Sequence, residues 1–312
     1  MKIVGKCVLL GTLAGLVCSG APWLARPVYA GPLPTAAQIL STFNLVTAGN
    51  VTTNSDVEGS AIIGGNLTGA TFFNNNAPNS PAIYLYGSES GNLDLDNGGS
   101  LYMNGTPGGS VNYNGGGHLV SSGPPLPLAD YSAPLIQLAA QLAALSQTAG
   151  NSIIGGTFNA VVGNNGVSVF DISASALQNS LTNSSINFNI GPGVTGVVVN
   201  VTGGSFAEPN STNWNTLDQN VLFDFDTATS VTVGNWQASV LAPNASLSIQ
   251  NGNINGSVYA TKFSGAGEVH DTLYDGTLPF VVPEPASLGL LSVGLGALVV
   301  LRRRKRRVMS GD

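Results

Sequence analysis

Two pairs of aspartates have a spacing that could place a metal ion on a β-strand. Asp94 and Asp96 form one pair, and Asp224 and Asp226 form the other. Because alternate side chains of a strand project from the same face, each pair should present both carboxylates together. Calcium takes several oxygen ligands, so all four aspartates are candidate calcium ligands. The alternative is two solvated pairs, since neither an EF-hand loop nor a calcium-binding nonapeptide repeat is present.

Carboxylates could also act as acid and base in polysaccharide cleavage, but the sequence does not pair them. His118 and His270 lie far apart, and neither a G-x-S-x-G nor an H-E-x-x-H motif occurs. We expect no catalytic residue and no enzyme; a polysaccharide hydrolase or lyase on a β-helix is the alternative. Asp56 and Glu58, in a turn-like segment, are expected to bind neighbouring backbone N–H groups.

Charge is strongly segregated along the chain. Between Gly31 and Val282 there are fourteen Asp and Glu residues against one lysine, Lys262, which gives this body a net charge of about −13. A nucleic-acid partner is excluded, because its phosphates would need many Lys and Arg side chains. Both cysteines, Cys7 and Cys18, precede residue 31, so the mature body would have no thiol for catalysis, metal binding or disulfides.

Residues 1–30 have the pattern of a secretory signal peptide. Lys2 and Lys6 precede an apolar run over residues 8–17, and Val28-Tyr29-Ala30 resembles a small-residue cleavage site. We predict cleavage after Ala30. A short N-terminal membrane anchor is the alternative reading.

The C-terminal end has three ordered parts. Pro283, Glu284 and Pro285 precede an apolar stretch at 286–301, predicted to be a transmembrane helix, and a basic tail at 302–307 that should stay cytoplasmic. This order resembles the PEP-CTERM sorting signal, here at 282–307. The resemblance implies an exosortase as partner. It also implies a Gram-negative-type envelope, a transient stay in the inner membrane and then the cell surface or extracellular matrix. A plain tail anchor is the alternative.

The body alternates short strand-like runs with Gly and Asn turns. Imperfect sequence repeats, such as Ile62–Asn66 and Ile153–Thr157, indicate a mainly β, right-handed β-solenoid-like domain. A flanking α-helix is predicted from Ala133 to Thr148, because leucines recur there every three or four residues, with Ser132 as its N-cap and Pro134 in its first turn. An antiparallel β-sandwich is the alternative. Ice binding would need a flat, regular threonine face, and Thr52-Thr53 and residues 227–232 are not expected to form one.

Two stretches resemble the choice-of-anchor A family of bacterial extracellular domains. One is Asn54–Gly59 with Gly64–Asn66, and the other comprises Leu241–Ala245, Asn253–Ala260, Gly265–His270 and Gly276–Pro279. The resemblance covers most of the body at 31–281. It implies a β-rich, adhesive or matrix-associated domain with no established catalysis. We therefore expect an exported surface or matrix protein that binds an extracellular polysaccharide or protein.

Overall fold

The computed structural model describes residues 32–74, 81–182, 185–209, 213–214, 219–250 and 252–279. The chain divides into two compact units, Met1–Gly31 and Pro32–Asp312, and all described residues belong to the second. The predicted signal peptide, with cleavage after Ala30, and the predicted sorting signal at 282–307 lie outside the described residues. Within the described ranges, no helix is both long enough and apolar enough to cross a membrane.

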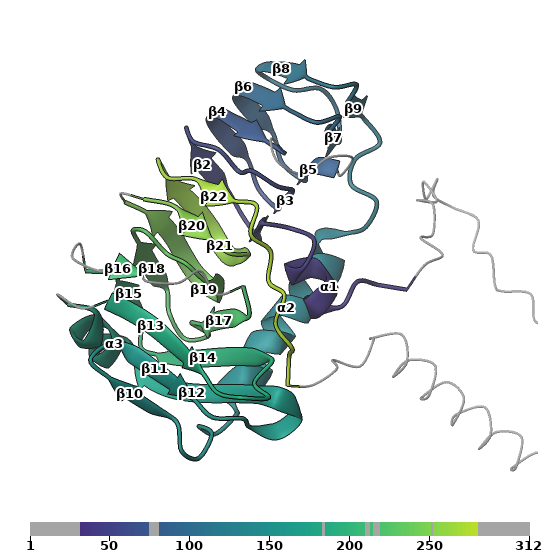
Figure 1. Ribbon diagram of the computed structural model, residues 1–312. Helices are drawn as coiled ribbons and strands as arrows, with labels where there is room; N and C mark the ends of the chain where they lie inside the picture. Colours follow the sequence, from purple (N-terminus) through teal and green to yellow (C-terminus); the bar gives the residue numbers. More distant parts are fainter. Residues whose placement is uncertain are drawn as a thin grey trace, which may run out of the picture. The chain divides into compact units, whose positions relative to one another are not determined.

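The first half of the domain is a stack of coils, and each coil contributes strands to two faces. We call the face that helices cover the helix face, and the other the open face. The helix face receives β1 (Leu45–Thr47), β3 (Ala61–Ile63), β5 (Pro81–Leu85), β7 (Ser100–Met103) and β9 (Leu119–Val120). The open face receives β2 (Val51–Thr53), β4 (Leu67–Phe73), β6 (Glu89–Leu95) and β8 (Ser110–Tyr113). Neighbouring strands pair in parallel, so each coil repeats the path of the previous one (Figure 1).

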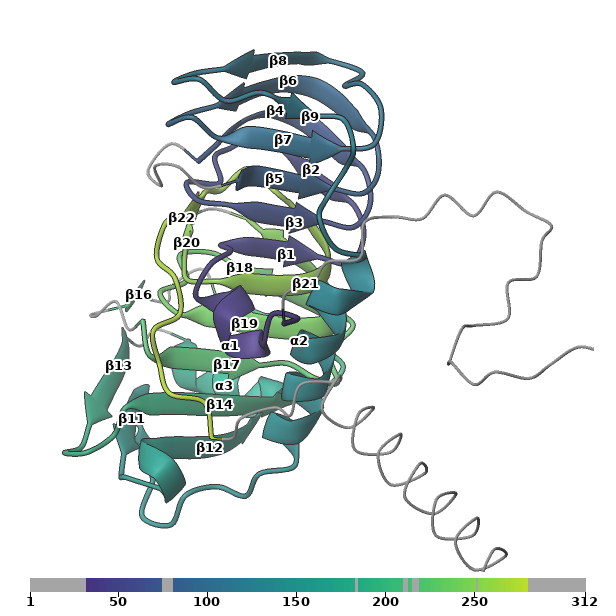
Figure 2. The same ribbon diagram turned by 90° about the vertical axis from the view of Figure 1, so that its right-hand side faces the viewer.

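Helix α2 (Leu128–Ala143) then carries the chain along the helix face to the far end of the domain, where the second half begins. It passes beside the short helix α1 (Ala36–Leu40) (Figure 2). Leu135, Leu138 and Leu142 are fully buried and recur every three or four residues, which makes an apolar stripe. This stripe packs on the outward-pointing apolar side chains of the sheet, among them Val198, Leu222 and Leu241.

The predicted helix is confirmed, but its predicted bounds are wrong. It begins at Leu128 after Pro127, not at Ala133, and it ends at Ala143 instead of Thr148. Pro134 lies inside the helix instead of in its first turn, and Ser132 is a helical residue and not the N-cap. Tertiary packing explains the difference, since Tyr131 and Pro134 are buried against the rest of the domain.

The second half coils back towards the first. Its helix-face strands are β12 (Val167–Ser173), β14 (Gly196–Thr202) and β17 (Val221–Asp224), and its open-face strands are β15 (Ser205–Ala207) and β18 (Ser230–Val233). The longer strands β19 (Ser239–Ile249) and β21 (Val258–Gly265) run from the helix face onto the open face. The remaining elements are β10 (Ser152–Ile154), β11 (Thr157–Ala160), the 3-10 turn η1 (Asn164–Gly166), α3 (Ala174–Leu181), β13 (Ser185–Ile190), β16 (Asn213–Trp214), β20 (Ile254–Asn255) and β22 (Val269–His270).

The two halves meet where the last long strand pairs with the first coil. On the helix face Val258–Ala260 pairs with β1, and on the open face Phe263–Gly265 pairs with β2, both in parallel. The described part of the chain is therefore one continuous β-solenoid. Its first and last coils in sequence lie next to each other in the middle of the stack. The solenoid prediction is confirmed, and the sandwich alternative is wrong because the strands of both faces pair in parallel.

Apolar side chains fill the interior of the coils. Aliphatic residues stack from coil to coil, as Val51 does on Leu67, and both are buried. In the second half aromatic rings dominate, and Trp236 lies with its ring centroid 4.8 Å from that of Phe223. With no cysteine in the body, burial of this core and the parallel ladders stabilise the domain.

Candidate functional site

A row of hydroxyl side chains runs across the open face. Strand registers align six positions, one from each of six successive coils: Thr232, Ser248, Ser264, Thr52, Thr68 and Ser90. We call these six residues the hydroxyl row. Adjacent strands lie about 4.8 Å apart, so the row extends for about 24 Å. As expected, Thr52-Thr53 and residues 227–232 do not form a threonine face: Thr52 and Thr232 belong to this regular row, but three of its six members are serines.

The hydroxyl row points to solvent, while its strand neighbours point into the core. Thr52, Thr68, Ser90 and Ser264 are exposed, whereas Thr232 and Ser248 are half-buried. Two pairs within the row are linked, since the Thr232 and Ser248 hydroxyls lie 3.0 Å apart and those of Thr68 and Ser90 lie 3.4 Å apart. The residue before each member of the row is buried, apolar in five coils and Glu89 in the sixth, and this alternation keeps the row fixed to the core.

A second row runs beside the first in the second half of the solenoid. Ser205, Ser230, Ser246 and Lys262 are aligned by register and are all exposed. Lys262 is the single Lys or Arg among the described residues. The open face is therefore a broad, mainly uncharged surface of hydroxyl groups.

Asp94 and Asp96 continue the open face in the first half. Each carboxylate accepts a hydrogen bond from an amide of the next coil: Asn112 Nδ2 donates to Asp94 Oδ1 at 2.9 Å, and Asn114 Nδ2 donates to Asp96 Oδ1 at 2.7 Å. Both aspartates are half-buried. The structure does not bring Asp94 and Asp96 together with the other predicted ligands, Asp224 and Asp226.

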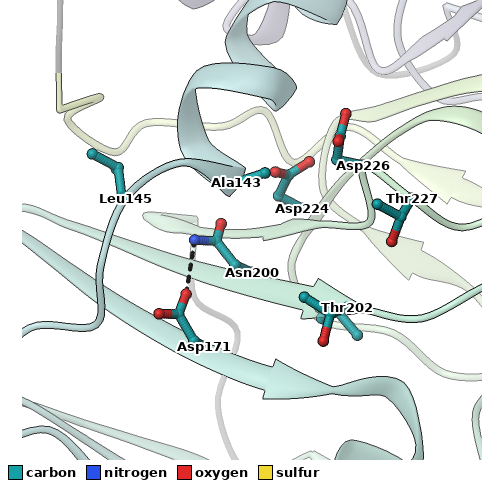
Figure 3. A pocket seen from close by; sticks show the side chains of 9 residues that line it. Ala143, Leu145, Asp171, Asn200, Thr202, Asp224, Asp226 and Thr227 are labelled. Carbon is teal, nitrogen blue, oxygen red and sulfur yellow. Dashed lines mark hydrogen bonds between the residues drawn. The ribbon is translucent and has the colours of Figure 1, made fainter.

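Asp224 and Asp226 lie on the helix face, next to the C-terminal end of α2. With Phe225 turned into the core between them, both line a cavity of about 300 Å³ together with Ala143, Asp171 and Asn200 (Figure 3). Asp226 is half-buried, whereas Asp224 is 1% exposed and neither of its carboxyl oxygens has a hydrogen-bond partner. Burial, with a further contribution from the charge of Asp226, raises the pKa of Asp224 to about 9.

Asp56 and Glu58 lie where the two halves of the solenoid meet. The Val269 N–H donates to Asp56 O, and the Val269 carbonyl oxygen accepts the N–H of Glu58, both at 2.9 Å. Glu58 Oε2 also accepts the N–H of Asp271 at 2.8 Å. The prediction that Glu58 binds a neighbouring backbone N–H group is confirmed, with a partner 213 residues away in sequence.

The same junction holds His270. Its Nε2 lies 3.0 Å from Glu268 Oε2, and its Nδ1 lies 2.6 Å from Asn255 Oδ1. The ligand atoms of Glu58, Glu268 and His270 all lie within 4.8 Å of one another, so this half-buried cluster has the spacing of a metal site. Each of the three side chains already has a protein partner. His118 is elsewhere, exposed and beside Ser100.

The sequence holds part of the signal for the hydroxyl row. Thr232, Ser248 and Ser264 recur every sixteen residues, and so do Thr52 and Thr68. The step from Thr68 to Ser90 is longer, and the step from Ser264 to Thr52 crosses the junction of the two halves. Asn200 and Asp171, which the sequence analysis missed, carry no comparable spacing relative to Asp224.

Comparison with known families gives two matches. Residues 36–271 match the family described as "Putative Ice-binding-like adhesive domain", and residues 281–307 match the PEP-CTERM protein-sorting motif. The second match confirms the predicted sorting signal. Choice-of-anchor A is not among these matches. No curated protein matches the sequence.

Several solved structures share low similarity with the chain. They include an ice-binding protein from the Antarctic ascomycete Antarctomyces psychrotrophicus (15% identity, 77% of this chain and 97% of that one, TM-score 0.28). Another is the ice-binding protein 1 DUF3494 domain of Shewanella frigidimarina (14% identity, 79% and 99%, TM-score 0.29). A third is an ice-binding protein from an Antarctic biological consortium (15% identity, 76% and 89%, TM-score 0.26). TM-scores this low carry no weight for the fold or function of this chain.

Proposed function

Because the chain belongs to the family of ice-binding-like adhesive domains over residues 36–271, we propose that its body is an adhesive module that binds its ligand through the open face. The PEP-CTERM motif at 281–307 implies handling by an exosortase and a place at the surface or outside of a Gram-negative bacterium. The protein is thus an exported surface protein. Passage through the inner membrane by a helix at 286–301, with a signal peptide cleaved after Ala30, completes the proposed route.

The hydroxyl row is the observation that supports an adhesive open face. Six in-register hydroxyls offer donors and acceptors at a regular spacing, which suits a ligand that is itself repetitive and rich in hydroxyl groups. A net charge of about −13 on residues 31–282 would repel anionic polymers. We therefore propose a neutral polysaccharide of the extracellular matrix as the ligand.

Bulky substitutions on the open face test this proposal. Thr52→Tyr and Thr68→Tyr place rings on exposed positions of the row, and Gln137→Tyr on the exposed side of α2 is the matched control. Binding to immobilised neutral glucans, measured by retention and by calorimetry, should fall by about tenfold or more in the first two variants and stay unchanged in the control. Equal binding by all four proteins would remove the open face as the binding surface.

Ice is a second candidate ligand, favoured by the family description and by the regular spacing of the row. The same variants distinguish it. If ice is the ligand, the purified protein lowers the freezing point below the melting point, Thr52→Tyr and Thr68→Tyr abolish this gap, and glucan binding is absent in every protein. If the parent produces no such gap, ice is excluded.

The proposal includes a non-enzymatic role. Glu58 and Glu268, which lie close enough for acid–base chemistry, are already bound to the Asp271 N–H and to His270. Release of reducing sugars or unsaturated products from extracellular glycans by the purified protein would contradict this part and favour the hydrolase or lyase alternative.

We further propose that the body is a choice-of-anchor A domain. One part of each stretch that carries this resemblance, Asn54–Gly59 from the first and Gly265–His270 from the second, lies at the junction of the solenoid halves, where the two parts are side by side. Their function there is structural, since they join the first coil to the last. Relatives that keep both stretches should therefore also keep the crossing helix and the closure by a late strand.

A further inference from the structure

The C-terminal end of α2 lies over a row of three polar side chains. Strand registers place Asp171, Asn200 and Asp224 side by side on β12, β14 and β17 (Figure 3). Asn200 Nδ2 donates to Leu142 O of α2 at 2.8 Å and to Asp171 Oδ1 at 3.0 Å. Two acceptors fix the orientation of this amide, so the Asn200 carbonyl oxygen lies on the side away from Asp171.

With Asp224 ionised, as a carboxylate that binds a cation must be, that orientation brings acceptors together without a donor. Asn200 Oδ1 and both carboxyl oxygens of Asp224 are buried and have no hydrogen-bond partner. Asn200 is 3% exposed and Asp224 is 1% exposed, so water at the protein surface does not reach them freely. Native proteins rarely leave buried polar atoms unpaired, and a buried carboxylate needs a partner most of all.

The surroundings add negative charge and no positive side chain. Asp226 lines the same cavity, and the C-terminal end of α2 carries a partial negative charge with no basic residue in its last turn. Lys262, the single Lys or Arg among the described residues, lies on the open face. His118 and His270 are bound to Ser100 and to Glu268 with Asn255.

We propose that this cavity binds a calcium ion, with Asp224, Asp226 and Asn200 Oδ1 as protein ligands. The ion would supply the positive partner that the buried oxygens lack. Calcium suits the set because it accepts six to eight oxygen ligands in flexible geometry, and a cavity of about 300 Å³ leaves room for bound water. Asp171 is a positioning residue, since it contacts Asn200 and lies one strand further from Asp224.

The proposed ligands come from two adjacent coils of the solenoid, and one of them is bonded to the helix that crosses these coils. Asn200 bonds to α2, while Asp224 and Asp226 belong to the next coil. Calcium should therefore raise the thermal stability of the domain as well as bind to it, because an ion that binds only the folded state stabilises that state.

Calorimetric titration of the purified, chelator-treated protein with calcium tests the proposal, with magnesium as a comparison. We expect one calcium per chain and an increase in melting temperature. Asp226→Asn, at a half-buried position, should weaken binding by at least about tenfold, and Asp224→Asn should abolish it. Asp171→Ala should weaken binding by about 10- to 100-fold through the loss of Asn200 orientation.

Asp94→Asn with Asp96→Asn is the matched control, because this pair has the same spacing but already has amide partners. The control protein should bind calcium like the parent. The proposal is overturned if the parent binds no calcium, if Asp226→Asn and Asp224→Asn bind it like the parent, or if the control loses binding. Equal affinity for magnesium would overturn the assignment to calcium. Should Asp224→Asn fail to fold, the Asp226→Asn result decides alone.

Discussion

Asp and Glu side chains occupy three different environments in this domain. Asp94 and Asp96 accept amide hydrogen bonds on an exposed face, and Glu58 accepts a backbone N–H at the junction of the two halves. Asp224 has no protein partner at all. Each environment depends on which residue the adjacent coil places alongside. The same aspartate spacing is therefore hydrogen-bonded to amides in one coil, whereas in another it includes a buried carboxyl group with no hydrogen-bond partner.

Glu208 gives the domain a predictable pH dependence. Burial raises its pKa to about 7, against the lowering effect of hydrogen bonds from the Gly234 N–H and the Trp214 indole. In the unfolded chain its pKa is about 4.3. Between about pH 4 and pH 7 the folded state therefore binds more protons than the unfolded state. The stabilisation that protonated Glu208 gives the folded state is present below about pH 4 and is lost as pH rises through about 7.

Replacing the ionisable group should remove this dependence. In Glu208→Gln, the decrease in unfolding free energy between about pH 4 and pH 8 should be smaller than in the parent by about 2 kcal/mol, a value discounted for partial exposure. Urea unfolding at several pH values measures the difference. Thr68→Ala, an exposed change that removes no ionisable group, should leave the curve unaltered. Parallel curves for the parent and Glu208→Gln would show that Glu208 ionises normally.

Residue spacing predicted half of the buried acidic cluster. The i, i+2 spacing singled out two residues that do line one cavity, although only Asp224 lies in strand β17 and Asp226 lies in the turn after it. It could not find Asn200, since the distance in sequence to the next coil depends on the length of the intervening loop. Nor could it show that Asp224 is buried, because the helix that covers it comes from residues far earlier in the chain.

At the scale of elements, α2 shows how packing overrides local signals. Its leucine spacing predicted a helix on this stretch, and the helix is present. Its start was misplaced because Pro134 is a helix-start signal in isolation, whereas the chain enters the helix six residues earlier. The apolar surface of the sheet favours a helix that starts five residues before the predicted Ala133, because this helix buries Tyr131 as well as the leucines.

The junction of the two halves should be sensitive to the smallest side-chain addition. A Cβ on Gly59 would lie 1.7 Å from Asn44 Oδ1, and Asn44 itself donates to His270 O at 2.8 Å. Gly59→Ala must therefore displace Asn44 and weaken the contact between the first and last coils. We expect the free energy of unfolding to fall by about 1–3 kcal/mol.

Gly204→Ala is the matched control for this prediction. No atom lies within 4 Å of a Cβ added at Gly204, so the same methyl group meets no obstruction there. Chemical denaturation of both variants gives the comparison. If Gly59→Ala is as stable as Gly204→Ala, the junction is looser than its hydrogen bonds indicate.

The whole domain was predictable as a solenoid, but its closure was not. Short runs separated by Gly and Asn turns indicated stacked coils, and the parallel registers confirm them. The two similar segments Ile62–Asn66 and Ile153–Thr157 have different structures. The first begins in the helix-face strand β3 and continues into the loop after it, whereas the second forms the antiparallel hairpin of β10 and β11. Pairing of β21 with β1 joins segments about 210 residues apart, and no local pattern specifies a contact of that range.

Sorting of the whole molecule depends on the segment that follows the solenoid. The PEP-CTERM match at 281–307 predicts that an exosortase handles the junction at Pro283, Glu284 and Pro285. Intact-mass analysis of protein from the outer-membrane and extracellular fractions of the native host should give termini near Gly31 and Pro283. Replacing the three residues with alanines should instead leave an unprocessed form, because two prolines that keep the chain extended would be lost.

The alanine variant also separates sorting from folding. Its solenoid, which the described residues place before Phe280, should keep the melting temperature of the parent, while its mass includes the apolar tail and its fractionation follows the inner membrane. The same mass and the same fractions for parent and variant would reject exosortase handling. An uncleaved tail in the parent would make the protein a simple membrane-anchored one. The open face would then lie at the inner membrane, where a matrix polysaccharide is not within reach.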